Sequence, residues 1–156
     1  MIAQNINKMI AEALKAREEL RLSTLRLLSS ALNYEKIAKQ HDLSEEEEMA
    51  VVKREASKRR DAIEALRQAQ GKPTTSSQKT LDDRLVQEEK ELEILKSFLP
   101  PEMSDAELEI IVDESINALG AQNMSDMGKV IGLVMSRAKG AADGRKVAEM
   151  VKSKLG

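Results

Sequence analysis

The chain has 156 residues, of which 41% are hydrophobic and 33% charged, and its formal net charge is −2. This composition is typical of a folded helical protein and not of a disordered chain. With no cysteine, one histidine, one tyrosine, one phenylalanine and no tryptophan, the chain excludes disulfides and histidine or thiolate metal clusters, and it disfavours base stacking on aromatic side chains.

Two amphipathic helices are expected at the N-terminus. Apolar residues at helical spacing predict the first over about residues 2–14, and the charged run 15–19 is expected to end it. The second is expected over about 18–39. Because its leucines occupy more than one face, we expect a central helix with neighbours packed on all sides.

The next two helices are expected to form an antiparallel hairpin. Ser44 and Glu47 have the spacing of a capping box and predict the start of a third helix that runs to about Gln70. The segment 71–77 has the composition of a loop, and a fourth helix follows over about 78–97.

Matching heptad seams set the predicted register of this hairpin. The seam positions are Met49, Val52, Ala56, Arg59, Ile63 and Leu66 in the third helix, and Leu81, Leu85, Glu88, Leu92, Leu95 and Leu99 in the fourth. Folded back on each other, the two seams bring Arg59 opposite Glu88. The sequence therefore predicts an ion pair inside the hairpin that fixes the register.

The segment 98–103 contains two consecutive prolines and is expected to link an N-terminal helical domain, 1–97, to a small three-helix domain, 104–156. The predicted helix boundaries in the small domain are a Ser104–Glu107 capping box, Gly120, a Ser125 cap, Gly140 and an Asp143 cap. The fifth helix is expected to bury Leu108, Ile111, Val112, Ile116 and Leu119. The overall prediction is an all-α fold.

The sixth helix carries the strongest positional pattern. Met127, Val130, Ile131, Val134, Met135 and Ala138 form one apolar face. Gly128, Gly132 and Ser136 follow at i, i+4 and i+8 beside it. Each glycine costs about 1 kcal/mol in a helix relative to alanine, so something is expected to approach this side closely. We expect that approach to be another helix of the small domain, with a phosphate backbone as the alternative.

Charge is concentrated at the C-terminus. Residues 121–156 hold seven basic and three acidic side chains, whereas residues 100–120 hold six acidic and none basic. The basic group comprises Lys129, Arg137, Lys139, Arg145, Lys146, Lys152 and Lys154. It is either a solvated face balanced by the acidic fifth helix or a contact for phosphates. The basic residues of helices two and three are expected to pair with glutamates.

The sequence offers no recognisable catalytic constellation. A phosphate-binding loop, a dinucleotide-binding glycine motif and a nucleophile elbow are all absent, and His41 is expected on the surface. We therefore predict no catalytic residues, no metal and no cofactor. Since no apolar run approaches the ~18 residues of a membrane span, we expect a cytoplasmic protein without membrane contact.

Several motifs carry a resemblance to a known family. They are the segments 19–26 (ELRLSTLR), 58–61 (KRRD), 98–100 (FLP), 127–132 (MGKVIG) and 139–144 (KGAADG). In this order and spacing the chain resembles the YqeY family over essentially its whole length. The segment from about Ser104 to Leu155 is also similar to the tail domain of the GatB subunit of glutamine-dependent tRNA amidotransferase.

The resemblance implies a relation to tRNA. In the amidotransferase, a carbon–nitrogen ligase with glutamine as amide donor, the tail helps to hold the tRNA while other domains carry the chemistry. No segment of this chain resembles those catalytic domains, so no catalysis by this chain alone is expected. The expected nucleic-acid-binding residues are Lys129, Gly132, Arg137, Lys139, Gly140, Arg145 and Lys146. The chain departs from the family at Ala141, where a lysine is usual, which removes one expected phosphate contact.

Two readings of the function follow. The first is a tRNA-associated accessory protein that binds through the C-terminal domain, with a possible protein partner in translation. The second is a non-catalytic helical protein–protein adapter without nucleic-acid contact. The pattern leaves the oligomeric state open.

Overall fold

The fold is all-helical, as predicted. A computed structural model describes residues 1–72 and 77–156, so the predicted loop 71–77 lies largely outside the described residues. The helices, in chain order, are α1 (Ile2–Lys15), α2 (Glu19–Lys39), α3 (Glu45–Ala69), α4 (Gln78–Lys96), α5 (Asp105–Leu119), η1 (Met124–Asp126), α6 (Met127–Ala138) and α7 (Gly144–Leu155). They gather into two compact units, 1–99 and 100–156, which are described separately. The division into domains 1–97 and 104–156 with a linker at 98–103 stays a prediction.

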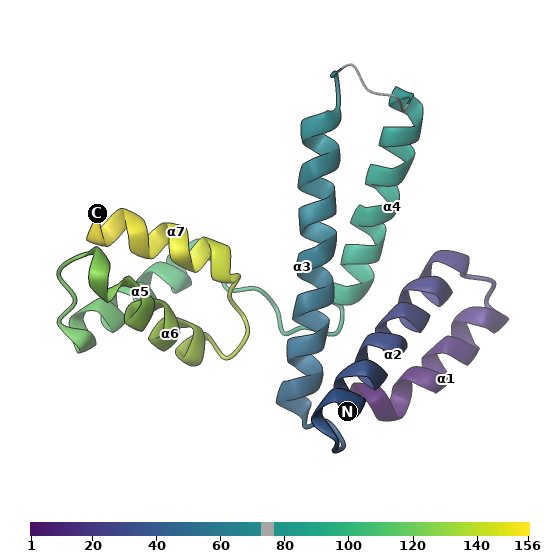
Figure 1. Ribbon diagram of the computed structural model, residues 1–156, viewed down its shortest axis with the longest axis horizontal. Coiled ribbons are helices and arrows are strands. Elements are labelled where there is room, and N and C mark those ends of the chain that lie inside the picture. Colours follow the sequence, from purple (N-terminus) through teal and green to yellow (C-terminus); the bar gives the residue numbers. More distant parts are fainter. Residues whose placement is uncertain (73–76) are drawn as a thin grey trace. The chain divides into compact units, whose positions relative to one another are not determined.

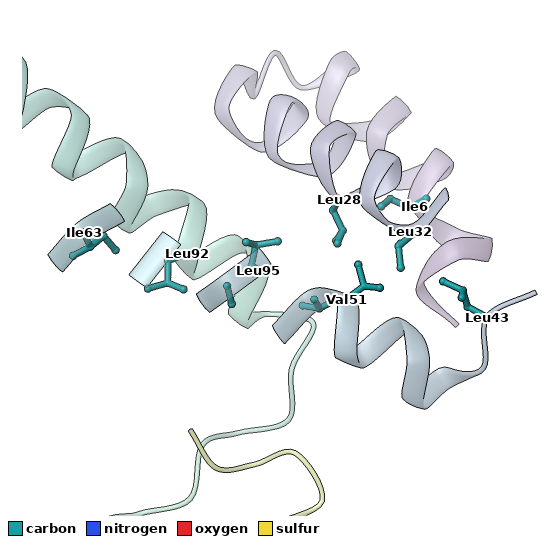
Figure 2. Close-up of a cluster of buried hydrophobic side chains, with 10 residues drawn as sticks. Ile6, Leu28, Leu32, Leu43, Val51, Ile63, Leu92 and Leu95 are labelled. Carbon is teal, nitrogen blue, oxygen red and sulfur yellow. The ribbon is translucent and has the colours of Figure 1, made fainter. Parts of the chain in front are cut away.

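The first unit consists of two helical hairpins, α1 with α2 and α3 with α4 (Figure 1). Its core is aliphatic and draws on all four helices, as Figure 2 shows for Ile6, Leu28, Val51 and Leu95. Each of these side chains is at most 2% exposed. Since the unit contains no tryptophan, branched aliphatic side chains supply the buried area that stabilises it.

The predicted hairpin register is confirmed by the ion pair that defines it. Arg59 Nε lies 3.5 Å from Glu88 Oε2, and a second carboxylate, Glu91, lies closer, with its Oε2 at 2.6 Å. Neither Arg59 Nε nor Glu88 Oε2 has hydrogen-bond geometry toward a described partner. The pair therefore acts by charge, and its main effect is to fix the register of two aliphatic seams.

Glu48 joins α1 to α3 in a way that the sequence did not indicate. Its side chain is fully buried, and its two carboxyl oxygens accept hydrogen bonds from the backbone N–H groups of Ile2 at 2.6 Å and Ala3 at 3.0 Å. These N–H groups belong to the first turn of α1, which has no side-chain cap of its own. A residue of α3 thus caps α1 from a distant part of the chain.

Helix α2 is less enclosed than predicted. Leu25, Leu28 and Leu32 are buried, but Leu27 is 53% exposed. The expectation of neighbours on all sides is therefore wrong for the outer side of this helix. The reason is geometric, because α1, α3 and α4 are the helices in contact with α2, and the core that they share with it contains Leu28 and Leu32 of α2.

The second unit packs α5, α6 and α7 around a separate core of Leu108, Val112, Val130, Val134, Val147 and Val151. The capping boxes at Ser44 and Ser104, the left-handed Gly120 and the Asp143 cap are as predicted. Two predictions are wrong. Asn123, not Ser125, caps the short turn before α6, because η1 intervenes, and Leu119 is 44% exposed at the end of α5.

Glu48→Gln is expected to release α1 from α3. A neutral amide loses the charged acceptor and turns an N–H₂ group toward a backbone N–H, and leaving a buried donor unsatisfied costs about 1–3 kcal/mol. We expect native-state hydrogen exchange at the α1 amides to become faster, by the factor to which this free-energy cost corresponds. Glu46→Gln, an exposed neighbour, is the control, and unchanged α1 protection in Glu48→Gln would contradict the capping role.

Glu47 is expected to contribute to acid sensitivity. The hydrogen bond from Lys39 Nζ, together with that from the Ser44 backbone N–H, lowers the pKa of Glu47 from 4.5 to about 2. A carboxyl with a depressed folded-state pKa contributes stability above its unfolded pKa and loses it as the pH falls through the folded value. The unfolding temperature of Glu47→Gln should therefore fall less steeply than that of the parent chain as the pH is lowered from 4.5 to about 2. An identical profile in Glu47→Gln and the parent chain would refute this.

Candidate nucleic-acid interface

Helix α6 has two opposite sides with different tasks. Val130, Val134 and Ala138 are buried at 0%, 0% and 5% exposure against α5 and α7. Gly128, Gly132 and Ser136 lie on the opposite side, and all three are exposed. We call these three residues the glycine strip. Their spacing of four residues places them in one row along the helix.

The glycine strip does not seat another helix of this unit. A Cβ atom built on Gly128 or Gly132 would have nothing within 4 Å. The expectation of an internal helix–helix contact is therefore wrong. Both α5 and α7 pack on the valine side of α6, so a three-helix unit leaves the opposite side uncovered.

Two exposed lysines flank the glycine strip. Lys129 and Lys139 are exposed, and neither has an ion pair among the residues that the structure describes. Lys129 follows Gly128 directly on the solvent side of the first turn of α6. Lys139 comes directly after the last residue of the helix. The exposed side of α6 therefore has few protruding side chains in its middle and a lysine near each end.

The turn after α6 has unusual backbone geometry. Helix α6 ends at Ala138, so Lys139 is the first left-handed residue at φ 45° and Gly140 follows at φ 87°. Two consecutive positive φ values turn the chain away from the helix directly after its last residue. The carbonyl of Ala141 accepts a hydrogen bond of 2.8 Å from the Met103 N–H, which fastens the turn to the segment before α5.

Three other basic residues of this unit, Arg137, Lys146 and Lys154, pair with carboxylates of acidic α5. Lys146 Nζ lies 2.8 Å from Asp105, and Lys154 Nζ lies 2.7 Å from Asp113 and 3.1 Å from Glu109. Hydrogen bonds to these carboxylates raise the pKa of both lysines. Arg137 lies 3.9 Å from Glu114, a looser contact. Part of the basic charge of this unit is thus neutralised by carboxylates of the same unit. Among the expected binding residues, Lys129 and Lys139 at the two ends of α6 have no ion pair with a described residue, so the candidate interface is centred on them.

The start of α7 is occupied by its own cap. Asp143 Oδ1 accepts a hydrogen bond of 3.0 Å from the Arg145 backbone N–H. This carboxylate fills the position where a phosphate would approach the helix N-terminus. Arg145 and Lys146, predicted as binding residues, stand beside an anion that the chain supplies itself.

The structure extends the candidate set by two residues. Gly128 and Ser136 share the exposed side with Gly132, and the spacing of i, i+4 and i+8 was the available signal. Elsewhere, the ranges 1–72 and 77–156 contain no group of three histidine, aspartate or glutamate side chains arranged to hold a metal ion. Within the same ranges, none of the helices has the length and apolar character needed to cross a membrane.

Alanine in the glycine strip should stabilise the protein. Gly128→Ala and Gly132→Ala add a methyl group into open space and reduce the freedom of the unfolded chain, which is worth about 0.4–1 kcal/mol each. Urea unfolding of the full chain would measure the gain. Gly120→Ala is the opposite control, because Gly120 adopts φ 61° and alanine is strained there. A loss of stability in Gly132→Ala would show that something in this chain does approach the strip.

Comparisons with known proteins add the family. No curated protein matches this chain. A family described as Yqey-like protein matches residues 3–155, which is essentially the full length and includes both units and the glycine strip. The match covers the segments that carried the resemblance in the sequence. The chain belongs to the YqeY family.

Proposed function

We propose that this protein is a tRNA-associated accessory factor that contacts RNA through the exposed side of α6, without catalysis by this chain alone. One observation carries the proposal: the glycine strip faces solvent between two lysines that have no ion pair among the described residues. Two glycines cost helix stability and gain no internal contact in return. A partner from outside the unit gives their placement a physical reason.

The shape of this surface suits a nucleic-acid backbone. Two glycines and a serine in one row let a phosphate–ribose chain lie close to the helix, and a lysine at each end can neutralise a phosphate. Residues 100–156 contain no aromatic side chain, so recognition by stacking on splayed bases is disfavoured. The surface therefore fits the folded, double-stranded body of an RNA, which proteins recognise by shape and by backbone contacts.

The resemblance of the segment 104–155 to the tail of the GatB subunit supports tRNA as the RNA class. It also supports an accessory role, because the amidotransferase chemistry belongs to other domains, and a cytoplasmic setting follows from a role in translation. Ala141 stands where a lysine is usual in the family. With few free cations, the affinity should be modest and strongly dependent on salt.

Lys129→Gln and Lys139→Gln should each weaken tRNA binding. Each removes one phosphate contact, so the logarithm of the binding constant should fall less steeply with the logarithm of the salt concentration, by about 0.7–0.9 in the slope. Fluorescence anisotropy with labelled tRNA across a salt series would measure both quantities. Lys154→Gln is the matched control, because its ammonium group is already engaged with Glu109 and Asp113.

Two further variants separate charge from shape. Gly132→Leu should fold normally, since a Cβ atom at this exposed position has nothing within 4 Å, yet it should weaken binding by keeping the RNA backbone away. Ala141→Lys should strengthen binding by restoring one cation. Absence of tRNA binding at low salt, or equal effects of Lys129→Gln and Lys154→Gln, would refute the proposal.

A further inference from the structure

The outer side of α2 carries an exposed apolar row that the fold of this chain does not use. Leu27, Tyr34 and Ile37 are 53%, 76% and 72% exposed. Ser23 and Ser30 are exposed in the same row. We call these five residues the α2 outer stripe. In the part of the chain that the structure describes, no other helix has three large hydrophobic side chains this exposed.

The spacing of the stripe is that of a helix–helix seam. Its positions, 23, 27, 30, 34 and 37, advance by four and three residues in turn, which is the a and d pattern of a coiled coil. They lie opposite the buried row of Leu25, Leu28 and Leu32. One side of α2 therefore serves the core of the first unit, and the other side has the pattern of a second helix contact.

We propose that the α2 outer stripe binds the same stripe of a second copy of this chain, with the two α2 helices antiparallel. Antiparallel helices pair a positions with d positions. This arrangement places Leu27 against Ile37 of the partner subunit and Ser30 against Tyr34 of the partner subunit. Each large side chain then meets either another apolar side chain or a small one, as close packing requires.

The flanking residues agree with this arrangement. On one side of the stripe, Arg26 comes opposite Gln40 of the partner subunit, and Asn33 comes opposite Asn33 of the partner subunit. On the other side Ala38 is exposed and small enough for close approach, whereas Thr24 and Ala31 face the core of their own unit. No like charges oppose each other. A parallel pair would instead stack Ser30 on Ser30 and Tyr34 on Tyr34, which leaves a gap in one layer and crowding in the next.

One helix pair makes a small interface. Standard interfaces bury about 800 Å² on each partner, and a seam of four layers is expected to bury less. We therefore expect a weak dimer that depends on concentration, with Tyr34 as its main anchor, because tyrosine is enriched among the residues that dominate binding energy.

Sedimentation velocity of the full chain over a wide concentration range tests the proposal. We expect the parent chain to shift from monomer toward dimer, and Ile37→Glu to remain monomeric over the same range. Ile110→Glu is the matched control, because Ile110 is 58% exposed on α5, outside the stripe. Circular dichroism would check that both variants are folded. A parent chain that stays monomeric, or a dimer that survives Ile37→Glu, would overturn the proposal, whatever other partner the stripe binds.

A second experiment tests the antiparallel direction. The chain has no cysteine, so a single introduced thiol reports on one site. Oxidation of a mixture of Ser30→Cys and Tyr34→Cys should give mainly the mixed disulfide dimer, because these positions face each other across the interface. Ser30→Cys alone should crosslink poorly. Faster crosslinking of Ser30→Cys with itself would overturn the antiparallel arrangement.

Discussion

The first unit depends on one buried carboxyl group. Helix α1 begins at Ile2 with no side chain of its own to satisfy its first N–H groups, and Glu48 of α3 accepts hydrogen bonds from two of them. The same residue lies in the first turn of α3, so the positive ends of two helices meet at a single negative group. This contact determines where α1 begins against α3. The aliphatic core, which includes Ile6 and Val51, then closes around that junction.

The hairpin shows the same use of charge in an aliphatic setting. Nearly uniform leucine, isoleucine and valine seams do not distinguish one register from another by shape alone. Arg59 between Glu88 and Glu91 makes a wrong register costly, because a shift would leave charges buried without partners. The second unit has no comparable buried ion pair among its described residues, and its acidic α5 instead pairs with lysines at the surface.

Two helix surfaces that this chain leaves uncovered are the proposed binding sites. Both lie on helices that are covered on one side only, α2 in the first unit and α6 in the second. They differ in chemistry, since the outer stripe of α2 exposes large apolar side chains, whereas the exposed side of α6 carries two glycines and is flanked by lysines. Apolar complementarity suits a protein helix, and a flat basic strip suits a phosphate backbone. The two surfaces therefore suit different partners, RNA for α6 and a second copy of this chain for α2. Either proposal can fail without the other.

The sequence by itself determined what depends on neighbours along the chain. Helix positions, the capping boxes at Ser44 and Ser104 and the glycine at 120 follow from local spacing, because helix formation and capping are local. The Arg59–Glu88 register followed from matching the heptad seams of two helices that are joined by a short loop. Only the tertiary structure decided which sides of the helices are covered. It placed Gly128 and Gly132 in open space, left Leu27 exposed and brought Glu48 to α1, although sequence spacing had suggested a packed strip and an enclosed α2. Periodicity reveals that a helix has distinct sides, but the number and direction of its neighbours decide which side meets solvent.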